Sequence, residues 1–498
     1  MKVLISDNLS KKGIDILRDA GLEVDIKTAL KPEELKSIIG DYDAIIIRSA
    51  TKLNSGIINA AKKLKVIGRA GSGLDNVDIN AATKRGIVVM NTPGGNTITT
   101  AEHAISLMLA MARNIPQATA SMKAGKWEKK KFMGVEVYNK VLGIIGLGNI
   151  GTQVAKRAQA LGMRVIAYDP YLSKDRAREL GIELLDLKEL LRRSDFITIH
   201  ASLTEETKNL INKETIALMK DGVRLINCAR GGIVNERDLY EALKSGKIAA
   251  AAFDVFEKEP PVDSPLIQLD NFICTPHLGA STSEAQENVA IAIAEQIVDY
   301  LTKGIIRNAV NYPSLPPETI EALEPFINLG ERMGCFLSQL LEVPIKELVI
   351  EYRGEVSKLP LKPITLAVLK GVFTPILGED VNYVNASLLA KERGVEVKEM
   401  TTENAGDYLS MIDLQIKGNG SIHNVSGVLH GKKEPRIIVL DGFPIEIVPE
   451  GEMLVIENID TPGVIGSIGT LLGNKGINIS RMQWGRQKPG GKAISIVS

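Results

Sequence analysis

Short blocks of apolar residues alternate with amphipathic segments over the first 95 residues of the chain. Apolar runs typical of buried strands lie at residues 3–5, 22–26, 43–48 and 64–68, and helix-like segments lie between the first of them at 11–20 and 32–39. Parallel strands must be joined by a crossover, which is usually a helix. The alternation therefore predicts a parallel sheet with helices on both faces.

A second series of the same kind follows a long, mostly apolar helix that is expected at residues 99–112. Its candidate strands lie at residues 141–146, 164–169, 196–200, 223–229, 249–256 and 271–277. This series predicts a second doubly wound parallel sheet. A further helix, at residues 283–301, is expected to carry the chain back to the first domain.

The C-terminal part of the chain has a different pattern. Prolines gather just after Val310, which predicts a linker. Residues 316–450 then read as an α+β domain. From residue 453 the pattern becomes strand, helix, strand, strand, and a sheet of this kind normally needs another helix to cover it. We therefore expect residues 453–498 to form an incomplete domain.

Composition narrows the class of protein and its partners. The 498 residues exceed what one core normally holds, and 44% apolar with 24% charged residues is ordinary for a globular protein. Lys+Arg and Asp+Glu both number 60, which argues against nucleic acid or a membrane as the main partner. Neither a signal peptide nor an apolar run of membrane-spanning length is evident, and the three cysteines form no Cys-x-x-Cys pair. We therefore expect a cytoplasmic protein without a metal site.

A glycine motif follows the first strand of the second series. Gly146, Gly148 and Gly151 form a G-x-G-x-x-G that opens a helix, which is the pattern that places a pyrophosphate at a helix N-terminus. The next strand ends at Asp169, where an acid can bind the ribose 2′-hydroxyl and repel a 2′-phosphate. The order of strand, glycines, helix and acid predicts NAD as the cofactor.

Three segments beyond this motif carry candidate catalytic residues at the ends of strands of the same sheet. They contain Arg230, the pair Glu257 and Glu259, and His277. A histidine can take a hydroxyl proton, a carboxylate can hold the ring, and an arginine can grip a substrate carboxylate. These groups suit oxidation of a 2-hydroxy acid. From the residues alone, His200 is almost as good a base as His277.

The motifs GLGNIG, NCARGG, DVFEKEPP and TPHLGA together resemble the D-isomer-specific 2-hydroxyacid dehydrogenases over residues 1 to about 310. The resemblance implies a substrate-binding domain of residues 1–97 plus 284–312 and an NAD-binding Rossmann domain of residues 98–283. It also implies Arg230, Glu259 and His277 as the catalytic set. The implied cofactor contacts are Ser72, Gly146, Gly148, Asn149, Ile150, Gly151, Asp169, Ala201, Cys228, Ala229, Arg230, Asp254, His277, Leu278, Gly279 and Ala280.

Further segments resemble one branch of this family, whose members oxidise D-3-phosphoglycerate to 3-phosphohydroxypyruvate with NAD in the first step of L-serine biosynthesis. IIIRSATKL, GRAGSGLDNVD and GKWEKKKFMG carry this likeness. It implies that Arg48 and Arg69 line the substrate site and that Lys129 reaches the substrate phosphate from a neighbouring subunit. A homodimer or homotetramer is therefore expected.

The tail resembles the regulatory part of the long members of that branch. Residues 316–450 resemble their intervening domain, and residues 453–498 resemble an ACT-like, ferredoxin-like domain that is expected to be truncated. The resemblance implies L-serine as a possible effector, bound by Asn458, Asp460 and Asn478. The expected fold is thus α/β, with two Rossmann-like doubly wound parallel-sheet domains followed by these two.

Two other functions remain open at this point. The chain could act on glyoxylate, glycerate or a longer keto acid, as other D-2-hydroxyacid dehydrogenases do. It could also be a non-catalytic NAD-sensing binding protein with the same fold. The basic residues Arg48, Arg69 and Lys129 favour a phosphorylated substrate over both alternatives.

Overall fold

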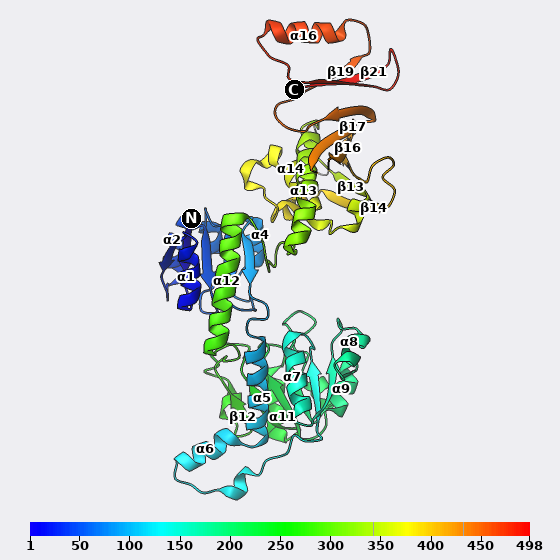
Figure 1. Ribbon diagram of the computed structural model, residues 1–498. Coiled ribbons are helices and arrows are strands. Elements are labelled where there is room, and N and C mark those ends of the chain that lie inside the picture. Colours follow the sequence, from blue (N-terminus) through cyan, green and yellow to red (C-terminus); the bar gives the residue numbers. More distant parts are fainter. Residues whose placement is uncertain (342, 432) are drawn as a thin grey trace.

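The computed structural model describes residues 1–341, 343–431 and 433–498 (Figure 1). It contains four sheets, and the chain passes through them in sequence order apart from one return by helix α12. We call the four parts built on these sheets the first, second, third and fourth units. No helix within the described ranges is both long enough and apolar enough to cross a membrane.

The first unit is a five-stranded parallel sheet in the order β2-β1-β3-β4-β5, which is a doubly wound order. Strands β1, β3 and β4 are largely apolar because helices cover both faces of the sheet, whereas the edge strand β2 contains Glu23 and Asp25. Strand β5 was not predicted, because its short apolar run precedes a segment rich in turn-forming residues. The elements are β1 Lys2–Ile5, α1 Lys11–Asp19, β2 Glu23–Ile26, α2 Pro32–Ile38, η1 Ile39–Asp41, β3 Ala44–Ile47, α3 Ser55–Ala60, β4 Val66–Arg69, α4 Ile79–Lys84, β5 Val88–Asn91 and, from further along the chain, α12 Ser283–Lys303.

The second unit is a seven-stranded parallel sheet in the order β12-β11-β10-β9-β6-β7-β8, so the strand order reverses beside β6 as in a dinucleotide-binding fold. Strand β8 was not predicted because two residues are too few to show a pattern. The elements are α5 Thr97–Ala112, α6 Ile115–Lys123, η2 Lys129–Phe132, β6 Val141–Ile145, α7 Asn149–Ala160, β7 Arg164–Tyr168, α8 Lys174–Glu179, β8 Glu183–Leu184, α9 Leu187–Arg193, β9 Phe196–Ile199, α10 Lys213–Ala217, β10 Val223–Asn227, α11 Glu236–Ser245, β11 Ile248–Phe253, η3 Pro265–Gln268 and β12 Phe272–Cys274.

The third unit is a six-stranded mixed sheet covered by the long helices α13 and α14. Strands β13 and β14 pair in parallel and the other neighbours pair antiparallel. The two helices approach closely at Gly371, because this residue has no side chain. An added Cβ there would lie 2.0 Å from the Glu331 carbonyl oxygen. The elements are α13 Pro317–Ser338, β13 Glu347–Gly354, η4 Glu355–Lys358, α14 Lys362–Leu377, η5 Gly378–Asp380, α15 Ala386–Glu392, β14 Glu396–Thr402, β15 Ser410–Lys417, β16 Ile422–His430, β17 Glu434–Leu440 and β18 Phe443–Ile447.

The segment predicted as a linker is partly held by the first sheet. The Val310 amide donates to the Val89 carbonyl at 2.9 Å, and Ala309 forms a bridge with Met90. The third unit also contacts the first, since the Asn382 amide donates to the Gly86 carbonyl at 2.9 Å. The junction is therefore an added edge pairing on β5 and not a free connection.

The fourth unit is a three-stranded antiparallel sheet in the order β19-β21-β20 with one helix. Its elements are β19 Leu454–Ile459, α16 Val464–Asn474, β20 Met482–Arg486 and β21 Lys492–Val497. Ile494 and Ile496 on β21 join the core of the third unit, so the fourth unit packs on the third through one sheet face.

Candidate active site

The turn between β6 and α7 brings the backbone into an arrangement that only glycine allows. Gly146 has a φ of 90°, and an added Cβ there would lie 2.7 Å from the His200 carbonyl oxygen. An added Cβ at Gly151 would lie 2.1 Å from the Gly146 carbonyl oxygen. Nothing lies within 4 Å of the same position at Gly148, so the turn is open on that side. These features fit a pyrophosphate at the start of α7.

Asp169 follows strand β7 and lies against this glycine turn. Its carboxylate accepts a hydrogen bond from the Leu147 amide at 2.8 Å and another from the Tyr171 amide at 2.9 Å. An acid at this place suits the ribose of NAD. The residues present therefore fit a dinucleotide with a free 2′-hydroxyl.

His277 and Glu259 form a pair beyond the ends of β12 and β11. The Nδ1 atom of His277 lies 2.9 Å from a carboxylate oxygen of Glu259. This hydrogen bond raises the pKa of His277 above 6.5, outweighing partial burial. Burial alone would raise the pKa of Glu259, but its contacts with His277 lower it overall. Glu257 faces elsewhere, because its side-chain carboxylate accepts a hydrogen bond from the Glu236 amide at 3.4 Å.

His200, the other candidate base, has a different environment. Burial lowers the pKa of its imidazole to about 4. Its Nε2 atom lies 2.9 Å from the Thr198 hydroxyl, and no hydrogen-bond partner for Nδ1 is found among the described residues. An enclosed neutral ring without a carboxylate beside it is less suited than His277 to exchanging a proton with a substrate.

Three arginines converge where the first and second units face each other. Burial, together with the charges of Arg230 and Arg48, lowers the pKa of Arg69 to about 10. The Nε atom of Arg69 is buried, with no partner found in the described part of the chain. Arg230 donates to the carboxylate of Asp75 at 2.9 Å, and Asp7 accepts from the Arg48 amide at 2.6 Å. This gathering of positive charge can take a ligand with more than one anionic group.

Asp75 is a site residue that the sequence did not single out. It belongs to the first unit, yet it orients Arg230 of the second unit. Its position in the segment GRAGSGLDNVD, next to the predicted Arg69 and Ser72, was the available signal. Ser72 itself donates to the Asn96 side chain at 2.7 Å, just before α5 begins.

The remaining predicted residues lie in other places. The expected cofactor contacts at residues 201, 228–230 and 277–280 follow strands β9, β10 and β12, at the edge where β6 ends. Lys129 lies on η2, in the loop that leaves the second unit beyond α6 at the end far from the first unit (Figure 1). Within one chain it does not join the three arginines.

The expected effector residues lie in the fourth unit, with Asn458 and Asp460 at the end of β19 and Asn478 in the loop between α16 and β20. Asp460 is paired with Arg486 at 2.7 Å, and this pairing lowers the pKa of its carboxyl. The Asn458 amide donates to the Ile459 carbonyl, while Asn478 is exposed. A ligand ammonium group would have to compete with Arg486 for Asp460.

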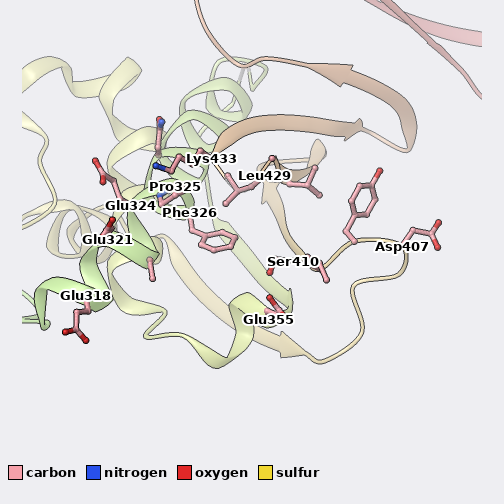
Figure 2. A pocket seen from close by; sticks show the side chains of 16 residues that line it. Glu318, Glu321, Glu324, Pro325, Phe326, Glu355, Asp407, Ser410, Leu429 and Lys433 are labelled. Carbon is pink, nitrogen blue, oxygen red and sulfur yellow. The ribbon is translucent and has the colours of Figure 1, made fainter.

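A large cleft lies away from these residues, between α13 and the loop that precedes β15 (Figure 2). Its volume is about 1120 Å³, and Phe326 and Leu429 form part of its lining. The acidic residues around it are Glu318, Glu321, Glu324, Glu355 and Asp407. No group of metal-ligating side chains is found in the described ranges, here or elsewhere. None of the residues predicted from the sequence lines this cleft.

Two family models match the chain. The NAD-binding domain of the D-isomer specific 2-hydroxyacid dehydrogenases matches residues 105–279. The D-3-phosphoglycerate dehydrogenase intervening domain matches residues 322–441. The first match covers the glycine turn and the His277–Glu259 pair, and the second lies within the third unit.

Curated relatives match along the full chain. D-3-phosphoglycerate dehydrogenase of Archaeoglobus fulgidus is 50% identical over 501 residues, covering 100% of this chain and 95% of the relative. The enzyme of the same name from Methanocaldococcus jannaschii is 46% identical over 499 residues, covering 100% of this chain and 95% of the relative.

Solved structures resemble the first two units. A glyoxylate reductase from Paecilomyes thermophila has 30% identity and a TM-score of 0.58, covering 62% of this chain and 98% of its own. D-lactate dehydrogenase from Aquifex aeolicus, complexed with NAD and lactic acid, has 28% identity and a TM-score of 0.56. The match covers 63% of this chain and 100% of that structure's chain. Fold, site and relatives together place the chain among the D-isomer-specific 2-hydroxyacid dehydrogenases, a family of NAD-dependent oxidoreductases, and within it among the D-3-phosphoglycerate dehydrogenases.

Proposed function

We propose that this protein oxidises D-3-phosphoglycerate to 3-phosphohydroxypyruvate with NAD, the first step of L-serine biosynthesis. The observation that carries the proposal is the convergence of Arg48, Arg69 and Arg230 near the His277–Glu259 pair. A substrate with only a carboxylate needs one such cation, whereas a phosphorylated hydroxy acid has two anionic ends. The names of the full-length relatives support the same substrate.

The side chains divide the chemistry between them. Arg230, held by Asp75, binds the substrate carboxylate and polarises the adjacent carbon–oxygen bond. Neutral His277 takes the proton of the C2 hydroxyl, and Glu259 stabilises the imidazolium that results. NAD, when bound, accepts the hydride that leaves C2.

The substrate phosphate is then bound by the remaining cations. Arg69 is half-buried, and its buried Nε atom has no partner among the described residues, so an anion would compensate a charge that is partly desolvated. We assign Arg48 and, from a neighbouring subunit, Lys129 to the same phosphate. This assignment requires a homodimer or homotetramer, because Lys129 lies on η2, after helix α6, and Figure 1 shows α6 at the end of the second unit away from the first.

The four units receive corresponding roles. We assign residues 1–97 with 284–312 to substrate binding and residues 98–283 to NAD binding. Residues 316–450 and 453–498 are assigned to regulation, with an ACT-like role for the fourth unit. The free state of all three cysteines suits the reducing cytoplasm in which such a pathway would work.

L-Serine is the effector that we propose for the fourth unit, with Asn458, Asp460 and Asn478 as its contacts. The Asp460–Arg486 pair gives a specific test, because Arg486→Ala would release the carboxylate for a ligand ammonium group. We expect this variant to bind serine more tightly than the wild type in calorimetric titration. Equal affinities, or no binding by either protein, would contradict the assignment of Asp460.

The catalytic proposal is tested by the stereochemistry and stoichiometry of the reaction. Wild-type protein supplied with D-3-phosphoglycerate and NAD should form one NADH for each 3-phosphohydroxypyruvate. The L-isomer should give no NADH above background, because its C2 hydrogen and hydroxyl exchange places relative to the carboxylate held by Arg230. Turnover of D-glycerate with NAD, or of glyoxylate with NADH, at equal or higher efficiency would favour another member of the family.

A further inference from the structure

Helix α5 contacts the segment that carries His277 through two polar side chains. The Thr100 hydroxyl donates to the Gly279 carbonyl at 2.9 Å, and this hydrogen bond is buried. One turn further along the helix, the Nε2 atom of His103 lies 3.0 Å from the Thr275 hydroxyl. The contacts fall on both sides of His277, so α5 holds the two ends of its turn.

The backbone at His277 needs such support. Its φ is 56°, in the left-handed region that side chains other than glycine rarely adopt. Residues in this region are strained and persist only where their surroundings enforce the conformation. Asp254, which is 1% exposed, supplies part of that support by accepting from the Leu278 and Gly279 amides at 2.7 Å each.

Asp254 and Thr100 hold opposite polar groups of the same turn. Asp254 satisfies its amide hydrogens, while Thr100 satisfies the Gly279 carbonyl. The two side chains come from different elements, since Asp254 follows β11 and Thr100 lies in the first turn of α5. The turn is therefore fixed between the sheet and the helix, and each contact limits where the His277 ring can point.

The start of helix α5 also contacts the first unit, close to the arginines proposed to bind the substrate. Asn96, the residue before its first turn, accepts from the Ser72 hydroxyl at 2.7 Å. Ser72 lies in the loop after β4, three residues beyond Arg69. One short stretch of helix thus connects the loop that follows Arg69 to the turn that carries the base.

We propose that Thr100 is a positioning residue for the acid/base group: its hydroxyl fixes the Gly279 carbonyl and thereby the direction of the His277 imidazole. The inference rests on the proposed role of His277. Thr100 acts through that turn and does not touch the substrate. A displacement of about 1 Å in a catalytic group can cost roughly 10²-fold in rate, so a single lost hydrogen bond is expected to be measurable.

Two substitutions separate the hydroxyl from the rest of the side chain. Thr100→Val keeps the branched shape but leaves the Gly279 carbonyl without its donor, and kcat should fall about tenfold. The acid limb of its pH–rate profile should also move to lower pH, because the ring no longer meets Glu259 in the same geometry. Thr100→Ser retains the hydroxyl and should stay within about twofold of the wild type in both measurements. Equal kcat values and pH profiles for the two variants would overturn the proposal.

A double-mutant cycle with His277→Ala tests whether the effect passes through the base. If it does, Thr100→Val should cost less than about twofold once His277 is absent. A tenfold loss in both backgrounds would show a general structural role and overturn the proposal. If His277→Ala itself kept full activity, both the proposed function of His277 and the role of Thr100 would fail. A neutral Thr100→Val beside an inactive His277→Ala would remove only the positioning role.

Discussion

Two sites of this molecule carry mainly opposite charge. The first, which we call the cationic site, gathers Arg48, Arg69 and Arg230 where the first and second units face each other. The second is the acidic cleft of the third unit, which is surrounded by carboxylates (Figure 2). The chain as a whole has a formal net charge of zero. Overall charge therefore says nothing about where an anionic or a cationic ligand binds.

The two sites also differ in how far their charged groups are exposed to solvent. All five carboxylates of the acidic cleft belong to exposed residues, so water stabilises them. Arg69 is half-buried, and this burial lowers its pKa to about 10. A desolvated charge that lacks a full set of partners gains more from an anionic ligand than a solvated charge gains from a counter-ion. The partial desolvation of Arg69, more than the number of charges, distinguishes the proposed active site from the acidic cleft.

The largest expected effect concerns His277, the proposed general base beside the cationic site. His277→Ala should lower kcat by roughly 10²–10⁴ while NAD still binds, because a general acid/base is lost. His423 offers a matched control, since it also pairs with a carboxylate, Asp441, at 2.7 Å, but in the third unit. His423→Ala should leave kcat within about twofold. Steady-state rates with D-3-phosphoglycerate compare the two variants, and an active His277→Ala would place the base elsewhere.

The next effect concerns the substrate phosphate. Arg48→Ala or Lys129→Ala should raise the KM for D-3-phosphoglycerate by about 10–150-fold, which corresponds to about 1.5–3 kcal/mol for a charge-assisted contact. The KM for D-glycerate should change far less. Glu321→Gln in the acidic cleft serves as the control and should leave both constants unchanged. Parallel rises for both substrates would mean that these cations do not bind phosphate.

Asp169 should determine the preference of the protein for NAD over NADP. Asp169→Ala should raise the KM for NAD about tenfold, because the contact with the ribose is lost and the glycine turn loses a hydrogen bond at Leu147. The same change should improve the use of NADP, because the negative charge that repels a 2′-phosphate disappears. The ratio of kcat/KM for the two cofactors measures this. A wild type that already used NADP as well as NAD would contradict the role of Asp169.

The smallest effect is a shift along the pH axis. Glu259 raises the pKa of His277, and oxidation requires the neutral imidazole, so activity rises with pH through that raised pKa. Glu259→Gln removes the stabilising charge and should move the acid limb of the pH–rate profile to lower pH. A profile that stayed in place would show that Glu259 does not control the protonation of His277.

Local patterns in the sequence were enough to predict the elements around the cofactor. The apolar run that ends at Ile145, the glycines at 146 and 151, and the acid at the end of the next strand fix one βαβ unit among neighbouring residues. The parallel sheets followed from the same alternation. Strand β8 was not predicted because its two residues show no periodicity, and β5 was not predicted because its short apolar run precedes a segment rich in turn-forming residues.

Contacts between distant residues could not be predicted in the same way. Asp75 and Arg230 are far apart in the sequence and meet only because the first and second units face each other. The left-handed backbone at His277 and the Thr100 contact with Gly279 depend on how α5 packs beside β11. The attachment of residues 309–310 to β5 replaced a predicted linker, because exposed edge groups of a strand can pair with any extended segment nearby.

The most direct test of the account is the substrate preference of the wild-type protein. We would measure kcat/KM for D-3-phosphoglycerate and for D-glycerate, both with NAD. The ratio of the two values reports how strongly the cationic site recognises the phosphate. Two or more charge-assisted contacts at about 1.5–3 kcal/mol each predict a ratio above about 100. A ratio near one would show that the half-buried Arg69 and its neighbours do not select a phosphorylated substrate, and would contradict the proposed function.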